Sequence, residues 1–180
     1  VSGNVFLTGR FECELDFNTA DAGCDVNAGC IKTAVAPPNL DTFLVKLDPD
    51  GNFLWGKDLG DGSVQTGFAV AVDPAGDAFM TGRYKGNVGL GAACALPSSA
   101  NIARSFLAKF SGTTGTCLWA KAWLNVCTNS NPDACRDLAT DAQGNVYWTG
   151  EFDASIDGSL TFGGAPLSCG CAKGSFIAEL

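Results

Sequence analysis

The feature that most constrains the fold is an internal repeat with a period of about 70 residues. A nine-residue segment that begins at Gly3 returns at Gly76 and at Gly144 without gaps, reading GNVFLTGRF, GDAFMTGRY and GNVYWTGEF. A second segment, FLVKL from Phe43, returns as FLAKF from Phe106 and as FIAEL at 176–180. A fold built from this chain must therefore use the same unit several times.

Both segments read as β-strands joined by tight turns. Phe43, Val45 and Leu47 share one face and alternate with residues of the other, which is the period of a strand. The turn pattern D-x-x-G-[D/N] recurs at 48–52, 73–77 and 141–145. We expect its Asp to cap the turn with its side chain and its Gly to adopt the positive φ that closes a hairpin.

Two such hairpins per repeat supply four strands, which is the content of one β-propeller blade. The sequence sustains no helical period, and Gly or Pro interrupts most windows. We therefore expect an all-β chain of tandem four-stranded antiparallel blades, about two and a half repeats of an incomplete, propeller-like ring. A β-sandwich is the alternative, but it does not need near-identical hairpins at a fixed period.

The repeat cores belong to a single domain and are separated by longer polar, Gly- and Ala-rich inserts. The cores span about 3–11, 41–84, 104–152 and 174–180. The chain begins at Val1 within an expected strand, and so few repeats cannot close a ring of roughly 4–8 blades. We expect the other blades to come from the rest of a longer protein or from neighbouring copies.

The repeat resembles a known family. The pattern G-N-V-[FY]-x-T-G-x-F, followed by D-x-F-[LIV]-[VA]-K-[LF]-D-x-x-G-x-x-L-W-x-K and A-V-A-x-D-x-x-G-[ND], is similar to the bacterial β-propeller repeat of large secreted proteins, the SBBP type. The resemblance covers 3–11, 41–60, 67–84, 104–123 and 137–152, with a last partial strand at 174–180, and not the inserts. The third copy departs from it with Glu179 where Lys46 and Lys109 stand. The resemblance implies an extracellular, non-catalytic repeat module and supplies no site residues.

The charge balance argues against two classes of partner. Lys and Arg number 11 against 19 Asp and Glu, so the formal net charge is −8. Such a chain has no electrostatic basis for binding nucleic acid or anionic lipid. No apolar stretch approaches the roughly 18 residues of a membrane span, so membrane insertion is not expected.

Nine cysteines are too many for an ordinary cytosolic domain. Zinc and haem sites use Cys-x-x-Cys or His spacings, and this sequence has neither, so a disulfide framework is favoured. It predicts an oxidising compartment, and because nine is odd, one thiol must be free or bonded outside the segment. We predict the bridges Cys24–Cys30 and Cys127–Cys135, which are close in sequence. Further candidates, whose partners the spacing does not assign, are Cys94, Cys169 and Cys171.

The sequence does not indicate an enzyme. Without His, no Ser-His-Asp or Cys-His arrangement can form within this segment. Asp48 and Asp50 could in principle serve acid–base chemistry or bind calcium, but carboxylates in a D-P-D-G turn are usually caps, and no bidentate Glu follows. We interpret Cys169-Gly170-Cys171 as structural half-cystines rather than a redox pair. No cofactor is expected, and calcium at the 48–52 turn is the alternative left open.

Four tryptophans remain to be placed. Trp55 and Trp119 occupy matching repeat positions, which predicts packing between blades. Trp123 and Trp148 break the repeat pattern and are predicted to lie at a surface, where they could stack against sugars.

These observations predict a non-catalytic extracellular or cell-surface scaffold whose inserts provide the contact surface. Its expected partner is protein, either the rest of its own chain or neighbouring copies. The alternatives are a carbohydrate-binding module, with glycan as the partner, and an accessory domain of a secreted hydrolase. The sequence does not identify the ligand.

Overall fold

The computed structural model describes residues 3–17, 31–34, 39–124, 126, 135–157, 159–168 and 172–180. The prediction of an all-β chain is confirmed. The strands are β1 (Val5–Phe11), β2 (Glu14–Asp16), β3 (Ile31–Thr33), β4 (Asp41–Leu47), β5 (Phe53–Asp58), β6 (Gln65–Val72), β7 (Ala78–Gly86), β8 (Ser99–Phe110), β9 (Cys117–Trp123), β10 (Cys135–Thr140), β11 (Val146–Asp153) and β12 (Lys173–Glu179). Two short helical turns, η1 (Ala92–Cys94) and α1 (Ala154–Asp157), lie in the inserts. In the described part of the chain, no helix has the length and apolar character needed to cross a membrane.

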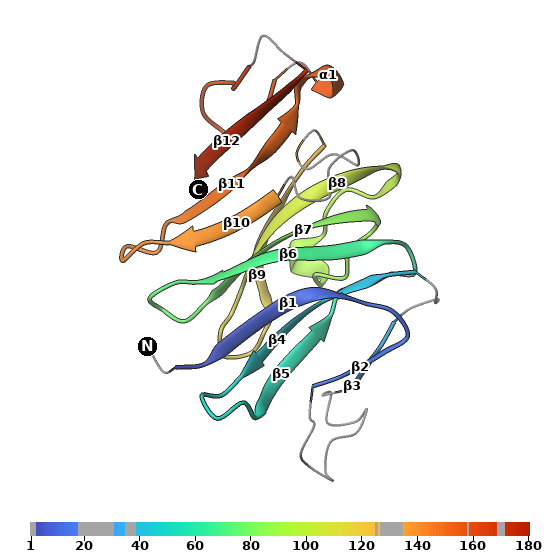
Figure 1. Ribbon diagram of the computed structural model, residues 1–180, viewed down its shortest axis with the longest axis vertical. Helices are drawn as coiled ribbons and strands as arrows, with labels where there is room; N and C mark the ends of the chain where they lie inside the picture. The colour runs from blue at the N-terminus through green and yellow to red at the C-terminus, as the bar shows by residue number, and fades with distance from the viewer. Residues whose placement is uncertain are drawn as a thin grey trace.

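Three antiparallel sheets follow one another along the chain and lie one above the next in Figure 1. The first has the order β1-β4-β5, the second β6-β7-β8-β9, and the third β10-β11-β12. A small separate hairpin pairs β2 with β3. Strand β6 lies between β1 of the first sheet and β10 of the third and contacts both, so the three sheets form one continuous stack.

The hairpins form where the turn pattern predicts them. The turns at 48–52, 73–77 and 141–145 connect β4 to β5, β6 to β7 and β10 to β11. In the first two, Gly51 and Gly76 have φ of 89° and 87°, a conformation that Gly adopts without the steric cost of a Cβ. Each Gly N–H donates to the carbonyl of the Asp that opens its turn, at 3.1 and 2.9 Å.

The core lies in seams between consecutive sheets. In the first seam, between the first and second sheets, Leu44 belongs to one cluster with Ala78, Met80, Phe106 and Ala108, and all five are 0% exposed. Burial of a Leu side chain contributes about 2 kcal/mol to the free energy of folding. These buried residues therefore stabilise the contact between the first and second sheets.

The second seam, between the second and third sheets, repeats the first position by position. Leu107 takes the place of Leu44 and is likewise 0% exposed. The third sheet covers it with the residues that match the partners of Leu44, namely Val146, Trp148, Phe176 and Ala178.

Tryptophans at matching positions line both seams. Trp55 packs edge-on against Phe6 at 5.8 Å between ring centroids, and Trp119 packs in the same way against Phe79 at 5.9 Å. The prediction that these two tryptophans pack between sheets is confirmed.

Close approach of β6 to the first sheet also requires Gly67, because a Cβ there would collide with the hydroxyl of Thr8.

Inserts fold back over the same face of their own sheets. Phe17, next to the β2–β3 hairpin, packs against Phe43 of the first sheet at 5.2 Å. In the third sheet, Phe162 packs against Phe176, which stands at the repeat position of Phe43, at 5.0 Å. The inserts therefore fill the space beside the face that each sheet turns toward the preceding one.

Candidate functional site

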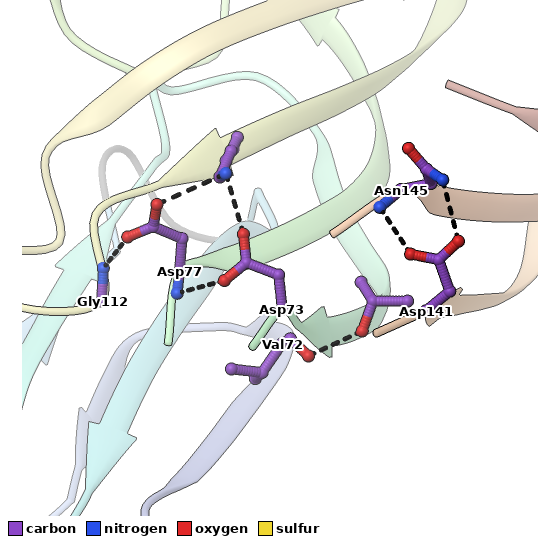
Figure 2. A network of polar contacts seen from close by, with 8 residues as sticks. Val72, Asp73, Asp77, Gly112, Asp141 and Asn145 are labelled. Carbon is purple, nitrogen blue, oxygen red and sulfur yellow. Dashed lines mark hydrogen bonds and ion pairs between the residues drawn. The ribbon is translucent and has the colours of Figure 1, made fainter. Parts of the chain in front are cut away.

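Aspartates cap the hairpin turns at one end of the sheets (Figure 2). Asp73 accepts a hydrogen bond from the backbone N–H of Asp77 at 2.9 Å. Asp141 accepts one from Asn145 in the same way, also at 2.9 Å. The first sheet matches them, because Asp48 accepts the N–H of Asn52 at 2.8 Å. The capping role predicted for the aspartate that opens each turn is confirmed.

At the 48–52 turn, the cap uses both oxygens of the Asp48 carboxylate. Oδ1 accepts the N–H of Asp50 at 2.9 Å, and Oδ2 accepts the side-chain amide of Asn52 at 2.8 Å. The side-chain and backbone hydrogen bonds from Asn52 lower the pKa of Asp48 and outweigh its partial desolvation. Nowhere in the described residues do three or more His, Cys, Asp or Glu side chains gather as metal ligands would.

An ion pair ties the second sheet to its own turn. Lys109 of β8 places Nζ at 2.8 Å from Asp73 Oδ2 and 3.4 Å from Asp77 Oδ2. The other oxygen of Asp77 accepts the backbone N–H of Gly112 at 3.0 Å, which connects this turn to the turn between β8 and β9. The ammonium also lies over the Phe79 ring at 5.1 Å. The group thus fixes both turns of the second sheet.

Opposing effects set the pKa values of this pair. Burial of Asp73, which is 5% exposed, acts to raise its pKa, but the hydrogen bond and charge of Lys109, together with the backbone N–H of Asp77, outweigh burial and hold the pKa below its ordinary value. For Lys109, burial acts to lower the pKa, and the two carboxylates reverse this and raise it. Both groups are therefore charged at neutral pH.

Lys46 stands at the same repeat position in the first sheet but has a different partner. Its Nζ donates to the carbonyl of Gly112, in the second sheet, at 2.6 Å. The indole N–H of Trp55 donates to the same carbonyl at 3.2 Å. The turn between β8 and β9 is thus bound by the preceding sheet. Beside these contacts is a hollow of about 290 Å³, lined in part by Asn4, Phe6 and Asp73.

The third sheet replaces the lysine with Glu179, which pairs across the sheet with Tyr147. The Tyr147 hydroxyl donates to Asp141 Oδ2 at 3.3 Å. Partial desolvation and then the negative charges of Glu179 and Asp141 raise the pKa of Tyr147.

Next to this turn, a hydrogen bond crosses the second seam: the Thr140 hydroxyl donates to the carbonyl of Val72 at 2.7 Å (Figure 2).

The structure separates the two tryptophans predicted to lie at a surface. For Trp148 the prediction is wrong: it is 0% exposed, because it occupies the position of Met80 and faces the second seam. Trp123 is half-buried at the end of β9, packs against the tilted ring of Phe162 at 5.2 Å between centroids and donates its indole N–H to the carbonyl of Thr161 at 3.0 Å. It lines an outer groove of about 400 Å³ with Leu96, Pro97, Lys121 and Phe162.

Among the described residues, one disulfide is formed, between Cys94 and Cys117. Cys94 was a candidate, but Cys117 was missed because it lies inside a repeat core. It stands where Phe53 stands in the first sheet, each paired with the last residue of the preceding strand, and this exchange of an aromatic residue for Cys is the signal in the sequence. The exposed thiol of Cys13 is not bonded. Outside the described part of the chain lie Cys24, Cys30, Cys127, Cys169 and Cys171, and with them both predicted bridges, Cys24–Cys30 and Cys127–Cys135, since only the backbone of Cys135, at the start of β10, is described.

Two sheet faces at the ends of the stack are exposed and apolar. The N-terminal face, on β1, carries Val5 and Leu7, which are 41% and 44% exposed. The C-terminal face, formed by β11 and β12, carries Tyr147, Ile177 and Glu179, and Ile177 is 75% exposed. These faces are the candidate interaction surfaces of the molecule.

Comparison with known proteins adds no identification. No protein-family model matches the chain. No curated protein sequence matches it either.

Proposed function

We propose that this chain is a non-catalytic, extracellular scaffold built of β-propeller blades related to the SBBP type. The observation that carries the proposal is the repetition of the seam. Leu44 and Leu107 occupy one repeat position and are each buried by the following sheet. Successive sheets that cover one another through matching residues are the packing on which a radial array of blades depends.

Strand order supports the same proposal. The second sheet has four strands in meander order, β6-β7-β8-β9, as a complete blade does. By repeat position, β1, β4 and β5 match the last three strands of that sheet, and β10, β11 and β12 match the first three. The first and third sheets are then incomplete blades.

Export is supported by the Cys94–Cys117 disulfide, which closes a loop across a sequence separation of 23 residues. Disulfides persist in oxidising compartments and are rare in the cytosol. In a scaffold of this kind, repeat cores supply rigidity, and the inserts that fold over the sheets present the variable surface.

The full-length product of the gene tests the proposal. Its structure by electron cryo-microscopy should contain further sheets that continue these three with the same sheet-to-sheet rotation. Peptide mapping without reductant should recover the Cys94–Cys117 bridge from exported protein. Unrelated folds packed against both end faces, or reduced Cys94 and Cys117 in the native protein, would contradict the scaffold and its location.

A carbohydrate-binding role is a second candidate, favoured by the outer groove beside Trp123. An indole and the phenyl ring of Phe162 stand together there with the cation of Lys121 nearby. Aromatic faces in such grooves can stack against sugar rings. Binding on a glycan array that is lost in Trp123→Ala would support this role, and an array without hits would count against it.

A further inference from the structure

The C-terminal face has the composition of a seam but no covering sheet. Ile177 stands at the repeat position of Leu44 and Leu107, which are both 0% exposed, yet it is itself 75% exposed. Tyr147 likewise stands where Phe6 and Phe79 line the two seams. Internal repetition therefore indicates what would cover this face: another sheet of the same kind.

The two existing seams show the apolar half of such a partner. Leu44 packs in one cluster with Ala78 and Met80 of the following sheet. Leu107 packs in the same way with Val146 and Trp148. A partner for Ile177 should thus present a small residue and a large apolar residue, two positions apart on one strand.

The charge of Glu179, at the edge of the C-terminal face, indicates which polar group the covering sheet would present. In the first seam, Lys46 donates to the Gly112 carbonyl, in the turn between the last two strands of the following sheet. Glu179 occupies the position of Lys46 and, when ionised, can only accept hydrogen bonds. A sheet that covers the C-terminal face as the second sheet covers the first would therefore place a donor or a cation in that turn.

A second copy of the chain meets the apolar requirement and fails the polar one. Its N-terminal face carries Val5 and Leu7 with the right spacing and exposure. Its corresponding turn, however, contains Asp48 and Asp50, so docking would bring Glu179 toward two further carboxylates. Like charges placed together at an interface oppose binding.

We propose that the C-terminal face binds a β-sheet of the same repeat whose last hairpin turn is basic, and that Glu179 excludes a second copy. This inference rests on the proposed scaffold function and specifies its partner. The Lys-to-Glu exchange in the third sheet then sets the order of sheets in the assembly, because it rejects the acidic turn of the first sheet.

A charge-swap series tests the proposal. The variant P49K/D50K makes the first turn basic and leaves the capping carboxylate of Asp48 in place, and both substituted residues are exposed. The variant E179K instead reverses the charge at the edge of the C-terminal face. The triple variant P49K/D50K/E179K makes both this edge and the first turn basic. Self-association is measured by sedimentation velocity at low and high salt.

We expect the wild type and the triple variant to remain monomeric. P49K/D50K and E179K should each associate head to tail, at least about tenfold more tightly than the wild type, and high salt should weaken them. Adding Ile177→Asp to either should abolish association without unfolding the chain, because Ile177 is exposed.

Equal association of all four proteins would show that Glu179 does not select the partner. No association in any of them would show that the C-terminal face is not a docking surface. Either result overturns this inference and leaves the scaffold function standing, because the latter is decided by the sheets of the full-length protein.

Discussion

Leu107 and Ile177 occupy the same position of the repeat and have opposite surroundings. Leu107 of the second sheet is 0% exposed beneath the third sheet, whereas Ile177 of the third sheet is 75% exposed. Both strands place an aliphatic side chain on the same face, so the strand itself does not decide burial. In this architecture the neighbouring sheet decides it.

The charged residues beside Leu107 and Ile177 also differ in their surroundings. Lys109 lies two residues after Leu107 and is held by Asp73 and Asp77 of its own sheet. Glu179 lies two residues after Ile177 and meets Tyr147 instead. The second sheet thus has a closed charge network beside a filled seam, and the third has an excess of negative charge beside an exposed face.

The largest effect is expected from Leu107→Ala. Removal of the side chain leaves a cavity in the second seam and should lower the free energy of unfolding by about 3 kcal/mol. Denaturation by urea, followed by tryptophan fluorescence, measures the loss. A loss below about 1 kcal/mol would mean that the seam does not couple the second and third sheets.

Lys109→Met should have the next largest effect. Methionine keeps most of the aliphatic stem but removes the cation from between two carboxylates, one of which is 5% exposed. The expected loss is about 2 kcal/mol, because the buried acceptor loses a charged hydrogen bond. Glu179→Met at the same repeat position is the matched control and should be close to neutral. Equal losses in the two variants would show that the ion pair contributes nothing specific.

The pH dependence of that difference should follow from Asp73. Its pKa is lowered in the folded state, so its contribution is present above an ordinary Asp pKa of about 4 and is lost as pH falls through the lowered value. The wild type should lose more stability on acidification than Lys109→Met, and their difference should shrink below about pH 4. Urea denaturation at several pH values checks this. A difference that grows in acid would assign the stabilisation to another group.

Repeat units and hairpins could be predicted from the sequence because their causes are local. The D-x-x-G-[D/N] turns at 48–52, 73–77 and 141–145 cap and close as expected. The alternation of Phe43, Val45 and Leu47 assigns the faces of a strand, and a strand has only two faces.

The burial of Trp148 and the bonding partner of Cys117 could not be predicted, because each depends on a neighbouring sheet or an insert. Trp148 is larger than its repeat partners Leu7 and Met80 and carries an indole N–H, and a fold is needed to show that the second seam has room for it. Cys117 pairs with a cysteine of an insert, and inserts do not share the repeat from which registers are inferred.

The smallest effect is expected from Ile177→Ala, the exact counterpart of Leu107→Ala on the exposed face. Its side chain has little burial to lose, so the free energy of unfolding should change by no more than about 0.5 kcal/mol. Urea denaturation of the two alanine variants under one condition gives the comparison directly. A loss near that of Leu107→Ala would mean that the face is already covered, and if a second copy covers it, the loss would depend on protein concentration. A concentration-dependent loss would contradict the exclusion of a second copy by Glu179. It would also contradict the difference in burial between Leu107 and Ile177.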